Sequence, residues 1–336
     1  MLGSDLAIDF GSVSTRVANA KGKVIYEQPT IVALDHESGK PVFYGAAALG
    51  SPAQGAGQLL VVHPVEAGQF ENISVAELFL KHVIEQTGRD FLRRRRVLAT
   101  IPLDATPVQL RATASALERA GVHKTRFLAQ PLASALGANV AIEAPVGSMV
   151  VDMGGEITNL AAVALGGVII GSTVHIGGES LVRALAHEFL ARDDLVVGPE
   201  IARQIRDEFG VLGETEENVR IEIVGRDRSN GELRTIAINN REISGIFLRE
   251  LTSVLDSVSK IIAESPPEIS NDLMTSGIVL AGGGSQLRGF AQVLAKAAGV
   301  PIHVFERPER LGVLGASRCL SSFQELEDSF MAASPR

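Results

Sequence analysis

Short apolar runs that lead into an acidic residue and a glycine-containing turn occur twice along the chain. Residues 6–8 lead into Asp9 and residues 149–151 lead into Asp152, and a further strand-like run follows each turn. This spacing predicts a strand, a polar turn and a second strand in both places. The repetition indicates an internal duplication, in which the two turns face each other across a cleft and form a clamp for phosphate.

The rest of the chain contains helical segments and two less regular regions. Helices are expected over residues 75–86, 106–120, 179–192, 199–209 and 243–263 and in a last helix ending at Gly299, with strands over 97–101 and 277–281 and a hairpin over 218–237. Residues 33–68 have short runs and turn residues without helical periodicity, which predicts a small inserted subdomain. The sequence therefore predicts an α/β protein of two domains, 1–145 and 146–320. The second domain carries an insert at about 180–240, and a tail covers 321–336.

Length and composition agree with two domains and exclude some functions. The chain has 336 residues, more than the roughly 250 to 300 residues that one core supports. Its 46% hydrophobic and 21% charged residues are typical of a globular protein. Trp is absent, Tyr occurs twice and the net charge is -8, so nucleic acid is not an expected partner. Cys319 is the single cysteine, no signal-peptide pattern precedes residue 6, and no apolar run approaches the roughly 20 residues of a membrane span. A cytoplasmic location is expected.

The two turns contain groups that suit a metal-bound phosphate. Asp9 and Asp152 would emerge at strand ends, where Mg²⁺ is commonly held by one or two carboxylates, waters and phosphates. A single Asp near Gly is usually a turn former, but the paired occurrence favours a site. Backbone N–H groups and hydroxyls for phosphate come from Gly11, Ser12, Val13, Ser14 and Thr15, and from Gly154 and Gly155 in the second turn. Hairpin formation alone could also explain the residues of the first turn.

Two further segments are candidates for ligand binding. Gly282, Gly283 and Gly284 stand between a strand and a helix, where they allow close approach to a flat ligand and direct a helix N-terminus at negative charge. Gln130 precedes Pro131 at the start of a helix. A neutral amide there can orient an attacking water, as a Gln does in some GTPases, and the alternative is a simple helix cap.

A basic segment near residue 90 is a candidate for membrane contact. Phe91 and Leu92 precede four consecutive arginines, at residues 93–96. Apolar insertion combined with attraction to anionic lipid is typical of an interfacial anchor, although a solvated charged loop is the alternative. One such short segment would bind a membrane usefully only when many copies act together in a polymer.

Over nearly its whole length the chain resembles the MreB family of bacterial actins. Residues 266–268, 277–284 and 287–289 resemble the adenosine motif of the family with its preceding helix, and residues 224–231 and 311–315 resemble other family segments. The resemblance implies an actin-like fold of two duplicated RNase H-like domains with inserted subdomains around a nucleotide cleft. It also implies ATP and Mg²⁺ in that cleft, and filaments at the inner face of the cell membrane that organise cell-wall synthesis with membrane proteins of cell-wall elongation.

The resemblance assigns roles by motif. The two phosphate loops correspond to Asp9, Gly11, Ser12 and Thr15, and to Asp152, Gly154, Gly155 and Thr158. The remaining nucleotide contacts correspond to Gly177, Gly178, Glu179, Gln204, Arg206, Gly282, Gly283, Gly284, Gln286 and Leu287, with Gln204 and Arg206 where ribose and adenine contacts are expected. Phe91 and Leu92 occupy the position of the membrane-insertion loop of the family. Gln130 and Asp152 are the residues expected to act in ATP hydrolysis.

Two departures from the family pattern change the expectation. Glu156 and Ile157 stand where the family has a third glycine and a threonine, and Ala129 and Gln130 stand where it has paired acids. A carboxylate about 4 Å from a phosphate charge costs roughly 4 kcal/mol at an effective dielectric near 20. Glu156 therefore predicts weakened nucleotide binding, unless the side chain turns away or a cation such as Arg16 or a shifted metal compensates. Gln130 is the residue that eukaryotic actin is expected to use at this position. These differences predict a divergent paralogue with slowed or altered nucleotide turnover.

A filament protein is the preferred of several functions compatible with the sequence. A weak ATPase would serve as a polymerisation switch in head-to-tail assembly with itself and with a related MreB. A small-molecule kinase of the same fold would need an acid near Ala129 and Gln130, where none stands. A chaperone would need a substrate-binding extension after the nucleotide domain. A nucleotide-impaired accessory scaffold is the remaining alternative.

Overall fold

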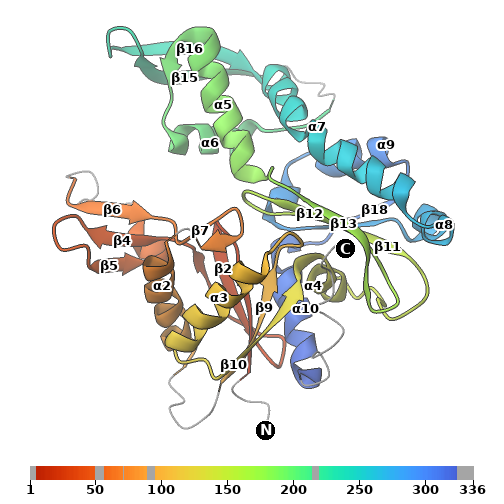
Figure 1. Ribbon diagram of the computed structural model, residues 1–336. Coiled ribbons are helices and arrows are strands. Elements are labelled where there is room, and N and C mark those ends of the chain that lie inside the picture. The colour runs from red at the N-terminus through yellow and green to blue at the C-terminus, as the bar shows by residue number, and fades with distance from the viewer. Residues whose placement is uncertain (1–4, 50–56, 71, 89–94, 214–218, 324–336) are drawn as a thin grey trace.

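The structure of the protein, a computed structural model, describes residues 5–49, 57–70, 72–88, 95–213 and 219–323 (Figure 1). Phe91 and Leu92 lie outside the described residues, as does the predicted tail beyond residue 323. The described chain forms two sheets with helices packed on them, and smaller inserted sheets extend from each half (Figure 1).

The first half is built on a sheet whose central strand carries Asp9. The strand order is β10-β9-β1-β2-β3, and β1 pairs antiparallel with β2 and parallel with β9. The strands are β1 (Leu6–Phe10), β2 (Ser14–Asn19), β3 (Val24–Pro29), β9 (Arg96–Ile101) and β10 (Lys124–Ala129), and the helices are α2 (Ile73–Gln86), α3 (Pro107–Arg119) and α4 (Gln130–Gly137). Asn72 and Thr106 cap α2 and α3, because their side chains accept hydrogen bonds from N–H groups that a helix start leaves free.

The second half repeats this arrangement. Its strand order, β18-β17-β11-β12-β13, matches that of the first sheet position for position, and β11 pairs antiparallel with β12 and parallel with β17. The strands are β11 (Ser148–Met153), β12 (Thr158–Ala164), β13 (Gly167–Val174), β17 (Ile278–Ala281) and β18 (Ile302–His303). The prediction of a duplicated α/β fold is confirmed.

Each half also carries an inserted region. In the first half it comprises β4 (Val32–Asp35), β5 (Pro41–Tyr44), β6 (Leu59–Val62), β7 (Val65–Glu66) and β8 (Gln69–Phe70). In the second half it comprises α5 (Gly178–Asp193), β14 (Leu195–Val196), α6 (Pro199–Phe209), β15 (Arg220–Asp227) and β16 (Leu233–Asn239). The predicted turn between β15 and β16 is confirmed, since Gly231 adopts φ +75° there. In Figure 1 the first insertion lies at the left and the second at the upper left, so both extend toward the same side of the molecule.

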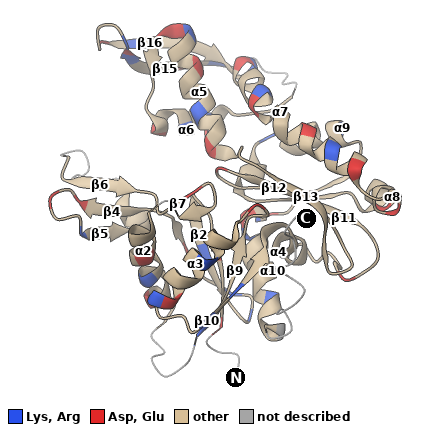
Figure 2. Ribbon diagram, viewed as in Figure 1, with Lys and Arg blue, Asp and Glu red and all other residues tan. Residues whose placement is uncertain are grey.

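The helices that follow return the chain to the second sheet. They are α7 (Asn240–Glu264), α8 (Pro267–Ser276) and α9 (Phe290–Ala298), and α9 ends at Gly299 in a left-handed conformation, as predicted. Acidic and basic residues are intermixed along α7 (Figure 2). Over the described ranges, every helix is too short or too polar to cross a bilayer.

The last helix, α10 (Leu311–Arg318), follows the second sheet in sequence but packs against α4 and strands of the first half (Figure 1). The two helices cross in backbone contact, since a Cβ on Gly315 would lie 1.8 Å from the Ala133 carbonyl oxygen. Val313 and Leu320 from this segment share one buried cluster with Leu98 of the first sheet and Val150 of the second. This cluster joins the two halves beneath the cleft.

Candidate functional site

A cavity of about 430 Å³ lies between the two halves, within the size range of small-molecule sites. Most of the predicted site residues line it: Asp9, Gly11, Val13, Ser14, Gln130, Asp152, Gly154, Gly155, Gly178, Glu179, Arg206, Gly282, Gly283, Gly284, Gln286 and Leu287. Residues from both sequence repeats therefore contribute to one site.

The two turns of the duplication have the same local geometry. Gly11 donates its N–H to the Ser14 carbonyl at 3.1 Å, and Gly154 donates to the Ile157 carbonyl at 2.8 Å. The turns also meet, since a Cβ built on Gly155 would lie 2.3 Å from Cγ2 of Val13. A side chain at residue 155 would therefore force Val13 to move. The predicted face-to-face arrangement is what the structure has.

Asp9 and Asp152 are buried at the floor of this cavity. Asp9 accepts a hydrogen bond from the Thr100 hydroxyl at 2.6 Å, and Asp152 accepts one from the Ser134 hydroxyl of α4. Burial raises the pKa of Asp9, and burial together with the nearby charge of Asp9 raises the pKa of Asp152 to about 7. Two desolvated carboxylates lining one cavity would gain free energy from a divalent cation.

The donor set fits Mg²⁺ rather than a metal held by protein alone. Within the described residues, no three His, Cys, Asp or Glu side chains cluster into a metal site. Mg²⁺ typically uses one or two carboxylates and completes its coordination with waters and phosphates. Asp9 and Asp152 could hold the ion in that way.

The glycine triplet has a packing role at two of its positions. Gly282 has φ +83°, and a Cβ there would meet the Met153 carbonyl oxygen at 2.2 Å. A Cβ on Gly284 would meet the Gly154 carbonyl oxygen at 2.7 Å. At Gly283 the nearest atom would be 3.7 Å away, an ordinary contact. The glycines therefore let the end of β17 lie against the second turn, and all three line the cavity.

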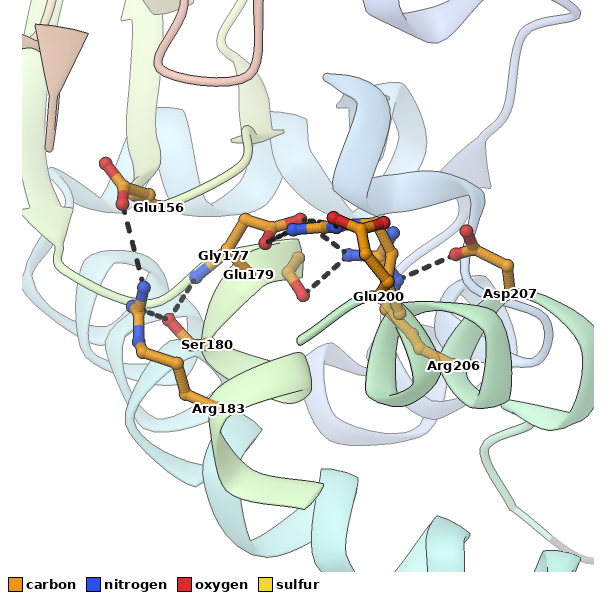
Figure 3. Close-up of polar contacts among 10 residues, drawn as sticks. Glu156, Gly177, Glu179, Ser180, Arg183, Glu200, Arg206 and Asp207 are labelled. Atoms are coloured by element: carbon orange, nitrogen blue, oxygen red, sulfur yellow. Dashed lines mark hydrogen bonds and ion pairs between the residues drawn. The ribbon is translucent and has the colours of Figure 1, made fainter. Parts of the chain in front are cut away.

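A cluster of charged side chains lies at the edge of the cavity beside the second glycine turn, where the backbone N–H of Glu179 donates to the Gly155 carbonyl at 2.6 Å (Figure 3). Glu179 accepts hydrogen bonds from Arg203 at 2.8 Å and from Arg206 at 3.2 Å. Burial alone would raise the pKa of the Glu179 carboxyl, but the two guanidinium groups outweigh it and hold the pKa below its usual value. Glu179 therefore remains an ionised acceptor, suited to hydroxyl groups of a sugar.

Some predicted residues lie beside the cavity or away from it. Within the described chain, Ser12, Thr15, Thr158, Gly177 and Gln204 are not among the lining residues. The Thr158 hydroxyl donates to the Ile176 carbonyl at 2.7 Å, and Gln204 donates to Glu208 along α6 at 3.0 Å. Their roles in binding nucleotide stay predictions.

Glu156 does not lie where the sequence predicted it. Its Oε2 accepts a hydrogen bond from the backbone N–H of Ala67 at 2.5 Å, and its Oε1 lies 3.6 Å from Arg183 Nη1 (Figure 3). Ala67 belongs to the β7–β8 hairpin of the first half, so this contact bridges the halves. Glu156 is not among the cavity-lining residues of the described chain. The carboxylate is therefore turned toward partners across the domain boundary, and the effect of its charge on nucleotide binding stays a prediction.

Removing Glu156 should accordingly weaken nucleotide binding rather than strengthen it. Glu156→Gly removes a hydrogen bond between the halves, and bonds to charged groups contribute about 1.5 to 3 kcal/mol. We expect calorimetry to show Mg-ATP affinity falling by about tenfold. Glu156→Gln retains an oxygen acceptor for Ala67 and should bind close to native. A gain of about a thousandfold in Glu156→Gly would instead place the carboxylate against phosphate.

Gln130 occupies the position in which a catalytic amide was predicted. It begins α4 and lines the cavity, and its Oε1 accepts a hydrogen bond from Asn159 Nδ2 at 3.1 Å. The start of α4 has no side-chain cap. The simple helix-cap role is therefore not what this side chain performs.

The sequence interpretation missed two residues that the hairpin register could have revealed. Arg16 lines the cavity and stands opposite Asp9 in the β1–β2 pairing, and Asn159 stands opposite Asp152 in the β11–β12 pairing. Arg16 was considered only as compensation for Glu156. It donates to Glu27 at 2.8 Å, and its charge opposes the rise that burial causes in the pKa of Asp9 and Asp152. Counting outward from each turn along its two strands would have paired Arg16 with Asp9 and Asn159 with Asp152.

Two duplicated sheets around a cleft, with paired strand-end aspartates and facing glycine turns, define the actin-like class of proteins. The model of the MreB/Mbl protein family matches residues 3–328, and the chain belongs to that family. The predicted family and fold are confirmed.

Individual relatives and solved structures agree with this assignment. The chain is 30% identical to the cell shape-determining protein MreB of Escherichia coli K12, covering 95% of this chain and 94% of the relative. It is 28% identical to the cell shape-determining protein Mbl of Bacillus subtilis 168, over 97% and 98% of the two chains. The fold is similar to MreB5 of Spiroplasma citri bound to AMPPNP, with a TM-score of 0.89 and 20% identity over 97% and 98%. It is also similar to MamK in a double helical filament, with a TM-score of 0.79 and 20% identity over 94% and 99%.

Proposed function

We propose that this chain is an ATP-dependent, actin-like filament protein that acts in bacterial cell shape. The observation that carries the proposal is the cavity in which both glycine turns and both buried aspartates converge. Relatives covering nearly the whole chain bear the name cell shape-determining protein, and similar structures hold AMPPNP or form a filament.

In this proposal each wall of the cavity binds one part of the nucleotide. Backbone N–H groups of the two glycine turns donate hydrogen bonds to the terminal phosphates, and Glu179 and Arg206 face the nucleoside. Mg²⁺ held by Asp9 and Asp152 would neutralise phosphate charge. Arg16 adds a cation from the protein itself at the same floor.

Nucleotide would control assembly because it contacts both halves at once. A ligand that binds the closed arrangement better than an open one shifts the population toward closure. Closure changes the outer surfaces of the two halves together, and a head-to-tail contact between copies can select that shape. Slow ATP hydrolysis at Gln130 would then determine when a filament disassembles.

The location of the filaments is also proposed. Phe91, Leu92 and the arginines after them combine apolar and cationic side chains suited to an anionic bilayer. Repetition of this segment along a filament would give binding that one copy lacks. Filaments would lie at the inner face of the cell membrane, in contact with membrane proteins of cell-wall elongation.

Sedimentation of concentrated protein tests the proposal. Mg-ATP should move the chain from supernatant to pellet, chelation of Mg²⁺ should reverse this, and Mg-ADP should support less pelleting. Anionic liposomes in the same assay should float with the filaments. A chain that stays in the supernatant under all conditions while consuming ATP with a small-molecule acceptor would be a kinase. A chain that pellets without binding Mg-ATP would be the accessory scaffold.

A further inference from the structure

Asn159 is a fully buried polar residue between the two halves. It lies on β12 opposite Asp152 and has no exposed surface. Its Oδ1 accepts hydrogen bonds from the backbone N–H of Leu103 at 3.1 Å and from the Thr173 hydroxyl at 2.8 Å. Its Nδ2 donates to Gln130 Oε1 at 3.1 Å. The side-chain amide therefore links residues of the first half, Leu103 and Gln130, to Thr173 on β13.

The orientation of the Asn159 side-chain amide is determined by its hydrogen-bond partners. A backbone N–H can only donate, so the atom of Asn159 that faces Leu103 must be the oxygen. Nδ2 then faces Gln130, and because Nδ2 can only donate, the atom that receives it must be Gln130 Oε1. The other end of the Gln130 amide, Nε2, has no partner among the hydrogen bonds of the described residues, and Gln130 lines the cavity.

We propose that Asn159 is a positioning residue that turns the Gln130 amide so that its Nε2 is the end available to the ligand. The proposal rests on the proposed function, in which that ligand is a nucleoside triphosphate. Gln130 then acts as a hydrogen-bond donor to a terminal phosphate oxygen or to the oxygen of an attacking water. A fixed donor directed at developing negative charge stabilises a transition state without moving a proton.

A double-mutant cycle on ATP hydrolysis tests this route of action. Asn159→Ala and Gln130→Ala should each slow single-turnover hydrolysis by about 10- to 100-fold, with Mg-ATP affinity changed less than about threefold. The double variant should be no slower than Gln130→Ala, because Asn159 acts through that side chain. Thr173→Val is the matched control, since it removes another partner of Asn159 and leaves the bond to Gln130. Independent, multiplying losses in the double variant would overturn the proposal.

A second measurement does not depend on hydrolysis or on nucleotide. In ligand-free protein labelled with ¹⁵N-glutamine, the Gln130 side-chain signal is identified by its loss in Gln130→Ala. Asn159→Ala should move this signal toward that of a freely rotating glutamine, and Thr173→Val should move it little. An unmoved signal would show that Asn159 does not hold the amide, even if ATP binding and hydrolysis are both present. Failure of ATP binding with a shifted signal would overturn the proposed function alone.

Discussion

Replacing Asp152 with Asn is expected to reduce Mg-ATP affinity by about 100-fold or more while leaving the protein folded. The substitution keeps an oxygen that can accept from Ser134, so the local hydrogen bond survives. It removes one of the two carboxylates available to a hard cation, and metal affinity depends on ligand charge. Calorimetry with and without a chelator measures the loss. The native protein should bind ATP more tightly when Mg²⁺ is present, and Asp152→Asn should bind it equally weakly in both conditions.

The same substitution should stabilise the ligand-free protein at pH 8. Burial raises the pKa of Asp152 to about 7, so between about pH 4 and 7 the folded protein holds a proton that the unfolded chain releases. Stability therefore falls as pH rises across this window, and Asp152→Asn should remove that fall. Thermal unfolding at several pH values checks this. Asp104→Asn, at an exposed acid paired with His175, is the control and should change neither property much. If Asp152→Asn instead lost thermal stability together with Mg-ATP affinity, Asp152 would have a structural role and not a metal-binding one.

Gly315→Ala is expected to destabilise the whole protein by more than about 4 kcal/mol, enough to prevent accumulation of folded chain. The added methyl would lie 1.8 Å from the Ala133 carbonyl oxygen and 2.7 Å from the Gly137 nitrogen. Both are backbone atoms of α4, which cannot move aside as a flexible side chain could. The two helices would have to separate and open the cluster that joins the two halves.

Soluble yield and thermal unfolding measure this effect. Gly167→Ala is the matched control, because a Cβ there meets nothing within 4 Å and its φ is not left-handed. It should stay within about 0.5 kcal/mol of native. Similar melting of the two variants would mean that α4 and α10 are not in contact in solution.

The parts of the fold and site that follow a local pattern could be predicted from the sequence. Asp9 and Asp152 each lie next to the last residue of an apolar strand before a glycine turn, and this repeated pattern was sufficient to place both in one cavity. The direction of Glu156 could not be predicted in this way, because its partner Ala67 lies 89 positions earlier in the chain. Local sequence shows that a charge is present but not which way the side chain turns.

Two other features depended on contacts between distant segments. Asn159 and Arg16 are ordinary strand residues in sequence, and their importance appears only when the register of each hairpin is worked out. The glycine triplet was interpreted as a ligand surface, yet at Gly282 and Gly284 a side chain would also collide with backbone atoms of the second turn. Packing and binding place the same demand on a glycine, so sequence alone does not separate them.

The position of α10 has a consequence for the order of events during synthesis. Strands of the first half are made before the second sheet, but Val313, Ala316 and Leu320, which share their buried cluster, follow every strand of the second sheet in sequence. Domains generally fold as units when their segments become available. The first half must therefore leave the ribosome with part of its apolar surface uncovered, and it can close that surface only after residues 313–320 have been made.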